Sequence, residues 1–87
     1  MNEVNPYSEQ VKIVQRAISL LRAEPDKSLF VELEEEQRGA GTSLEWYGIT
    51  KVTFERFIAS RSLSENTRMA LKAGVHAVRV IFGAAKP

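Results

Sequence analysis

The sequence predicts an all-α fold, and the spacing of its apolar residues supports this class. Apolar residues recur three or four positions apart in two long segments, at Val11, Val14, Ile18 and Leu21 and again at Leu71, Val75, Val78 and Phe82. The chain is 44% hydrophobic and 26% charged, which is typical of a globular domain. We therefore expect a compact bundle of about five helices, built as a single domain over residues 1–87.

The first predicted helix follows Asn5-Pro6 and ends at Pro25. Asparagine is a good N-cap, and proline is favoured at the first helical position because its missing N–H has no partner there anyway. A proline in the middle of a helix removes a hydrogen bond and clashes with the preceding turn, so Pro25 stops the helix. The apolar stripe between these limits is expected to face the core.

Two interpretations of the next segment remain open. Asp26 or Ser28 can cap a helix over residues 28–37, whose Glu, Leu and Gln are good helix formers. Alternatively, residues 29–47 form a small β-hairpin that turns at residues 38–41. Periodicity does not separate the two over so few residues.

The segment 42–60 has the organisation of a helix-turn-helix. Thr42 and Glu45 have the spacing of a capping box, which predicts a short first helix. Gly48 suits a tight turn, and Thr50 is a good N-cap for a second helix. In that helix Phe54, Phe57 and Ile58 share one face and are predicted to be core residues, while Lys51, Val52 and Arg56 point elsewhere.

This segment resembles the helix-turn-helix of bacterial and phage repressors, most closely the lac repressor family. The matching positions are Gly48, Ile49, Thr50, Thr53, Phe54, Arg56, Phe57 and Ile58, followed by residues 63–68. The resemblance implies a transcriptional repressor that binds double-stranded DNA. It places Lys51, Val52 and Arg56 at base edges. It also implies phosphate contacts from Thr50, Thr53, Arg61, Ser64 and Asn66.

The C-terminal helix, predicted over residues 64–83, is the candidate dimerisation element. Small repressors bind two half-sites as dimers, so we expect a homodimer on an inverted-repeat operator. The apolar residues assigned to the dimer contact are Leu71, Val75, Val78, Ile81 and Phe82. The stripe of the first helix is the alternative contact surface, and residues 78–82 form a short strand in a second interpretation of this end.

Composition argues against an enzyme. There is no cysteine and only one histidine, His76, which lies among apolar neighbours and is more typical of a structural or surface residue. We expect no metal, no cofactor, no small-molecule effector and no membrane segment. Met1-Asn2-Glu3 does not resemble a signal peptide, which predicts a cytoplasmic protein.

Charge is unevenly divided along the chain. Residues 1–37 hold four basic and eight acidic side chains, whereas residues 38–87 hold eight and three. The basic half therefore contains the suspected DNA-reading segment, as nucleic-acid binding requires. The alternative function is that of a small phage or plasmid inhibitor or an antitoxin-like protein, which binds another protein through the acidic segment 32–36.

Overall fold

The computed structural model describes residues 7–60 and 63–85 and contains four helices in this part of the chain. They are α1 (Ser8–Ala23), α2 (Ser28–Gln37), α3 (Ser43–Ile58) and α4 (Glu65–Ala85). The described residues form no strand. The all-α class is thus confirmed, with four helices where about five were expected.

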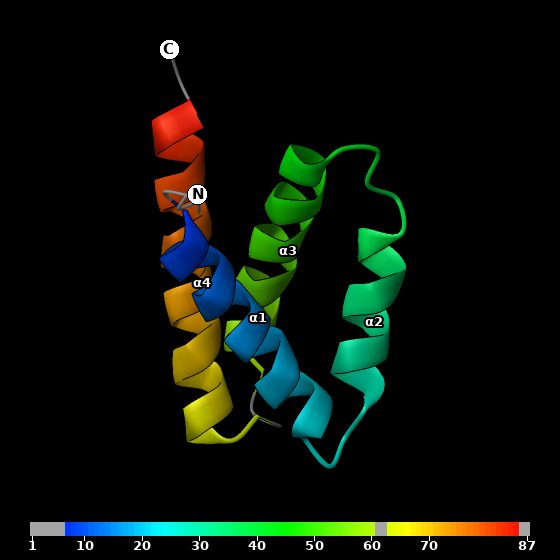
Figure 1. The fold of residues 1–87 in the computed structure, drawn as a ribbon. Helices are drawn as coiled ribbons and strands as arrows, with labels where there is room; N and C mark the ends of the chain where they lie inside the picture. The colour runs from blue at the N-terminus through cyan, green and yellow to red at the C-terminus, as the bar shows by residue number, and fades with distance from the viewer. Residues whose placement is uncertain (1–6, 61–62, 86–87) are drawn as a thin grey trace, which may run out of the picture.

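The helices run alternately up and down, and α4 lies beside both α1 and α3 (Figure 1). The outermost helix is α2, which packs mainly on α3 and only slightly on α1. One face of α4 is therefore covered by two helices. This leaves its opposite face and the adjoining side of α1 exposed, on the side of the bundle away from α2 (Figure 1).

A single apolar core joins the four helices. Phe54 and Phe57 of α3 are buried in it, as their spacing predicts. The other buried apolar residues come from α1, α2, α4 and the α3–α4 connection: Val14, Ala17, Leu21, Leu33, Leu63, Leu71, Val75, Ala77, Val78 and Ile81. The stripe of α1 is therefore core, as its periodicity predicts.

Gly74 allows three helices to meet at one point. A Cβ atom at this position would lie 2.8 Å from Cε2 of Phe54 and 3.6 Å from Cβ of Ala17. Since the Phe54 ring is fully buried, the absence of a side chain at Gly74 gives the ring its space against α4. The same contact sets Ala17 of α1 level with Gly74 of the antiparallel α4.

The helix boundaries follow local sequence signals in most places. The first helix ends at Ala23, before Pro25, while Asn5-Pro6 lies outside the described residues. The segment from Ser28 is helical, so the hairpin alternative is wrong, and Asp26 Oδ1 accepts a hydrogen bond from the Ser28 N–H at 2.9 Å. This hydrogen bond lowers the pKa of Asp26 below its usual value.

The α3 helix begins with the predicted cap. Thr42 Oγ1 accepts a hydrogen bond from the Glu45 N–H at 3.1 Å. The Glu45 carboxylate reaches back to the N–H of Gly41 at 3.2 Å rather than to that of Thr42. Both hydrogen bonds satisfy donors in or before the first turn, so the local signal for a helix start at this point is confirmed.

No turn divides α3 at Gly48, and the prediction of two short helices there is wrong. The helix is continuous through this position, and no described glycine has a positive φ. Thr50 is not an N-cap: its hydroxyl donates to Trp46 O, one turn back, at 2.7 Å, and accepts from Gln37 Nε2 at 2.8 Å. Gly48 instead faces Phe82 of α4, whose Cζ lies 3.4 Å from the Cβ position. Packing of α3 along α4 thus outweighs the helix-weakening tendency of glycine.

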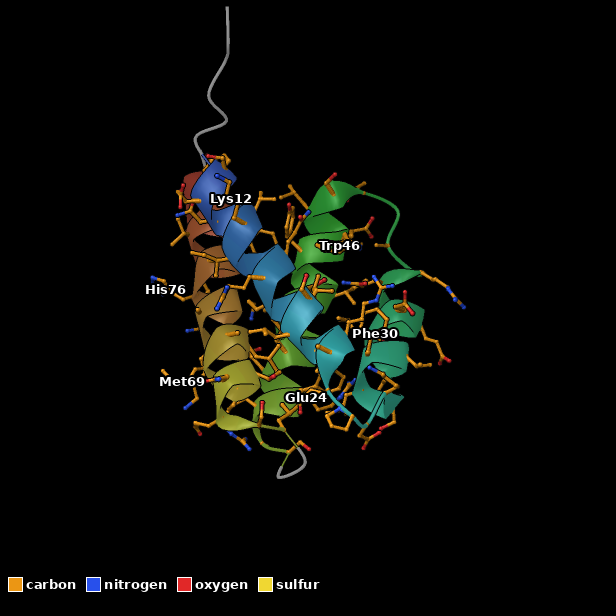
Figure 2. All side chains as sticks on the ribbon, turned by 60° about the horizontal axis from the view of Figure 1, so that its bottom comes forward. Lys12, Glu24, Phe30, Trp46, Met69 and His76 are labelled. Carbon is orange, nitrogen blue, oxygen red and sulfur yellow. The ribbon has the colours of Figure 1, made fainter. Side chains whose placement is uncertain are left out.

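Glu24 ties the end of α1 to the start of α4 (Figure 2). Its buried carboxylate accepts hydrogen bonds from Thr67 Oγ1 at 2.6 Å, from Ser64 Oγ at 2.8 Å and from the Ser64 N–H at 3.1 Å. These hydrogen bonds, that of Thr67 first, lower the pKa of Glu24 and keep it ionised. The negative charge also suits the N-terminal end of α4.

Candidate functional site

The three predicted base-reading residues lie on or near the surface of α3. Val52 is 55% exposed, and Lys51 is partly exposed. Lys51 Nζ pairs with Glu55 Oε1 at 3.2 Å, and Glu55 Oε2 pairs with Arg79 of α4 at 3.1 Å. Lys51 and Arg79 thus share one carboxylate, so this cluster keeps one net positive charge.

Arg56 is held by the acidic helix beside it. Its guanidinium forms an ion pair with Glu32 and lies 3.9 Å from the Glu36 carboxylate, both on α2. The guanidinium also lies 5.7 Å from the centre of the Phe57 ring. The side chain is half exposed, but the carboxylates around it give this part of α3 no positive surface for phosphates.

The predicted phosphate-binding residues are not brought together. Thr50 and Thr53, predicted to contact phosphates, are buried, and their hydroxyls lie inside the bundle because α3 continues past Gly48. Ser64 caps α4, and its N–H and hydroxyl both donate to Glu24. Asn66 is exposed at the start of α4, and Arg61 lies outside the described residues.

The predicted dimer contact is part of the core of the single chain. Leu71, Val75, Val78 and Ile81 are buried and Phe82 is half-buried. These residues are covered because α4 packs against both α1 and α3 of the same chain. An apolar stripe in a sequence indicates that something covers it, without indicating whether the cover comes from the same chain.

Charge is separated between the two sides of the bundle. Each of α1 and α4 carries three basic residues and one acidic residue, while α2 carries four glutamates and no basic residue. The helix between them, α3, carries two of each sign. The basic side is thus formed by the first and last helices together, and the helix predicted to read DNA lies between the basic and the acidic sides (Figure 1).

The basic side also exposes apolar side chains along the junction of α1 and α4. Met69 is 61% exposed and Val80 38% exposed, and Ala73 lies between them on the same face of α4. Figure 2 shows Met69 and His76 pointing outward from α4, away from Trp46 and Phe30. We call this surface the α1/α4 seam, defined by Met69, Ala73 and Val80 with Leu20, Arg16 and Lys12 of α1.

The cations of the α1/α4 seam are available for a partner. Among the described residues, Lys12 and Arg16 of α1 and Lys72 of α4 are exposed and take part in no ion pair. Between the two helices lies a hollow of about 370 Å³, lined by Arg16, Leu20, Asn66, Met69 and Ala70. This surface therefore combines apolar contacts with unmatched positive charge.

The sequence analysis did not predict this surface, although the residues of the C-terminal helix contain a periodic pattern that indicates it. Asn66, Met69, Ala73, His76 and Val80 follow each other at alternating intervals of three and four residues, which is a second stripe on the same helix. It is less apolar than the stripe that forms the core. Its position beside Arg16 and Leu20, about fifty residues away in the chain, is a consequence of tertiary packing.

A second hollow, of about 530 Å³, lies on another side of the bundle. Its lining comes from Gln15 of α1, from residues 40–43 of the α2–α3 connection, and from Trp46 and Tyr47. Trp46 is partly buried against the core and meets Tyr47 edge to face at 5.1 Å between ring centres. This hollow is wide and open to solvent, and its aromatic residues serve mainly to pack α3.

The part of the chain that the structure describes contains no group of three or more His, Asp or Glu side chains arranged to hold a metal ion. Its helices include none that is long and apolar enough to cross a membrane. Comparison of the chain with protein-family models, with curated proteins and with solved structures gives no match.

Proposed function

We propose that the protein acts by binding another protein at the α1/α4 seam, without catalysing a reaction, in the manner of a small inhibitor or an antitoxin-like regulator. The observation that carries this proposal is the exposure of Met69 and Val80 on a surface bordered by unpaired Arg16 and Lys72, with unpaired Lys12 one turn from Arg16 on α1. Exposed apolar surface with a polar rim is typical of protein interfaces, in which Met and Arg are enriched.

Photo-crosslinking in the producing cell tests this proposal. A photoreactive phenylalanine analogue replaces Ala73, in the middle of the seam, and in a matched control it replaces Val31, which is 47% exposed on α2. We expect one protein to be crosslinked from position 73 and not from position 31, and the crosslink to be lost when Arg16→Glu is added. Equal crosslinking from both positions would contradict the proposal.

The second candidate function is the repressor that the sequence resemblance implies. The observation that favours it is the same set of cations, since Lys12, Arg16 and Lys72 suit a phosphate backbone as well as an acidic protein. In this alternative the dimeric repressor binds an inverted-repeat operator, with Lys51, Val52 and Arg56 as the candidate base contacts.

Selection from a random duplex pool separates the two candidates. A repressor returns one enriched sequence, and its affinity for that duplex falls steeply as salt rises because phosphate contacts release counterions. Enrichment of a duplex whose binding is lost in Arg16→Glu would replace the protein-binding proposal with the DNA-binding one.

A further inference from the structure

We infer that the partner segment bound at the α1/α4 seam is an amphipathic helix whose apolar face is flanked by acidic residues. This inference rests on the proposed function and names the chemistry of the partner. The observation that supports it is an apolar floor with positive charge on both sides, between two antiparallel helices that cross at an angle (Figure 1).

The floor of the seam is made of small and flexible apolar side chains. Ala70 is half-buried and Ala73 exposed, so the backbone of α4 is open to close approach along this line. Met69 and Leu20 border the 370 Å³ hollow, where a large apolar side chain of the partner fits between α1 and α4. Methionine is suited to this role because its thioether chain adapts to different neighbours.

The length and direction of the seam suit a helix. The 16 residues of α1 limit the seam to about 24 Å at 1.5 Å per residue, which is long enough for about four turns of a docked helix. The described part of the fold contains no β-strand and so presents no sheet edge for an extended peptide to join. A helix with apolar residues three and four apart matches the spacing of Met69, Ala73 and Val80.

Positive charge on both rims selects an acidic partner. Lys12 and Arg16 lie one turn apart on α1, and Lys72 lies on the other side of the stripe on α4. Each of these two helices has one acidic residue, and it lies in the first turn: Glu9 in α1 and Glu65 in α4. A second copy of the chain would bring the same cations face to face, so the charge pattern disfavours self-association.

Titration with helical peptides tests the inference. The probe is a peptide of about 18 residues, long enough for a stable amphipathic helix, with leucines on one face and glutamates beside them. The matched probe has lysine at every glutamate position. In NMR spectra of the labelled protein we expect the acidic peptide to shift the amide signals of Met69, Ala73 and Leu20, and the basic peptide to leave them unchanged.

Two seam variants and two control variants outside the seam show whether the peptide binds at the α1/α4 seam. Arg16→Glu combined with Lys72→Glu is expected to weaken binding of the acidic peptide at least tenfold, and Met69→Asp to weaken it by a similar factor. Arg38→Glu and Leu44→Asp are the matched controls, since both residues are exposed away from the seam, and they are expected to bind as the parent does. Circular dichroism verifies that each variant is folded.

Each other outcome overturns the inference in a recognisable way. Equal binding of the two peptides, or shifts confined to α2 and α3, removes the acidic helix as the partner. Shifts at the seam with a short DNA duplex but with neither peptide assign the surface to nucleic acid. If neither peptide binds while position 73 still crosslinks one protein in cells, the partner has other chemistry and the proposed function stands.

Discussion

Substitution of Gly48 by alanine distinguishes a continuous α3 from a helix-turn-helix by the sign of its effect. In the interior of a helix, alanine is more favourable than glycine by about 1 kcal/mol. The added methyl group would meet Phe82 Cζ at 3.4 Å, an ordinary contact with the end of a half-buried ring. We therefore expect Gly48→Ala to raise the free energy of unfolding by roughly 0.5–1 kcal/mol.

A turn at Gly48 predicts the opposite result. A left-handed backbone disfavours alanine by about 1–2 kcal/mol, so the two structures differ by roughly 2 kcal/mol in the effect of one methyl group. Urea unfolding followed by circular dichroism measures this, and a stabilisation of this size raises the Tm by roughly 2–8 °C in a domain of this length. Gly83→Ala is the control for propensity, because nothing lies within 4 Å of its Cβ position. A decrease of more than about 1 kcal/mol in the free energy of unfolding of Gly48→Ala would refute the continuous helix, provided that Gly83→Ala shows no such decrease.

Three further predictions concern the packing and the charges of the bundle. Gly74→Ala is expected to lower the free energy of unfolding by about 1–3 kcal/mol, because the new methyl group overlaps the buried Phe54 ring at 2.8 Å; a neutral effect in urea unfolding would contradict this packing. Glu24→Gln is expected to destabilise the protein at neutral pH. Since folding lowers the pKa of Glu24, its contribution is complete well above the ordinary value of 4.5 and is lost as pH falls through the folded pKa. The stability difference between parent and variant should therefore shrink below about pH 4.5, and a difference independent of pH would exclude the charge as its cause. Arg56→Ala is expected to change stability by less than about 1 kcal/mol, as its ion pair with Glu32 is half exposed; a larger loss in the same assay would indicate a role in packing.

Local sequence signals were sufficient to predict most of the helices. Pro25 sets the end of α1, and Thr42 with Glu45 sets the start of α3, because each acts on backbone groups within a few residues. The periodic apolar residues of α1 and α4 identified long helices, and the spacing of Phe54 and Phe57 identified core residues. These features depend on interactions within one helix, so the sequence by itself determined them.

Tertiary structure decided whether the backbone at Gly48 forms a turn or continues the helix. Glycine is compatible with a turn and with a helix, and the local sequence does not choose between them. Packing of α3 against α4 makes the helix continuous, with Phe82 beside the glycine. Thr50 and Thr53 consequently face the interior of the bundle instead of a phosphate backbone.

The candidate site also depended on how the helices are arranged. The sequence pattern predicts a dimer contact at the C-terminal apolar stripe, but two helices of the same chain cover it and leave the weaker stripe of Met69 and Val80 exposed. Similarly, the division of charge along the chain placed positive charge at the predicted reading helix. Folding instead sets Arg56 beside the acidic α2 and places the unpaired Arg16 beside α4. Which face is covered, and which charges meet, are set by contacts between residues far apart in the chain, and a local pattern does not contain that information.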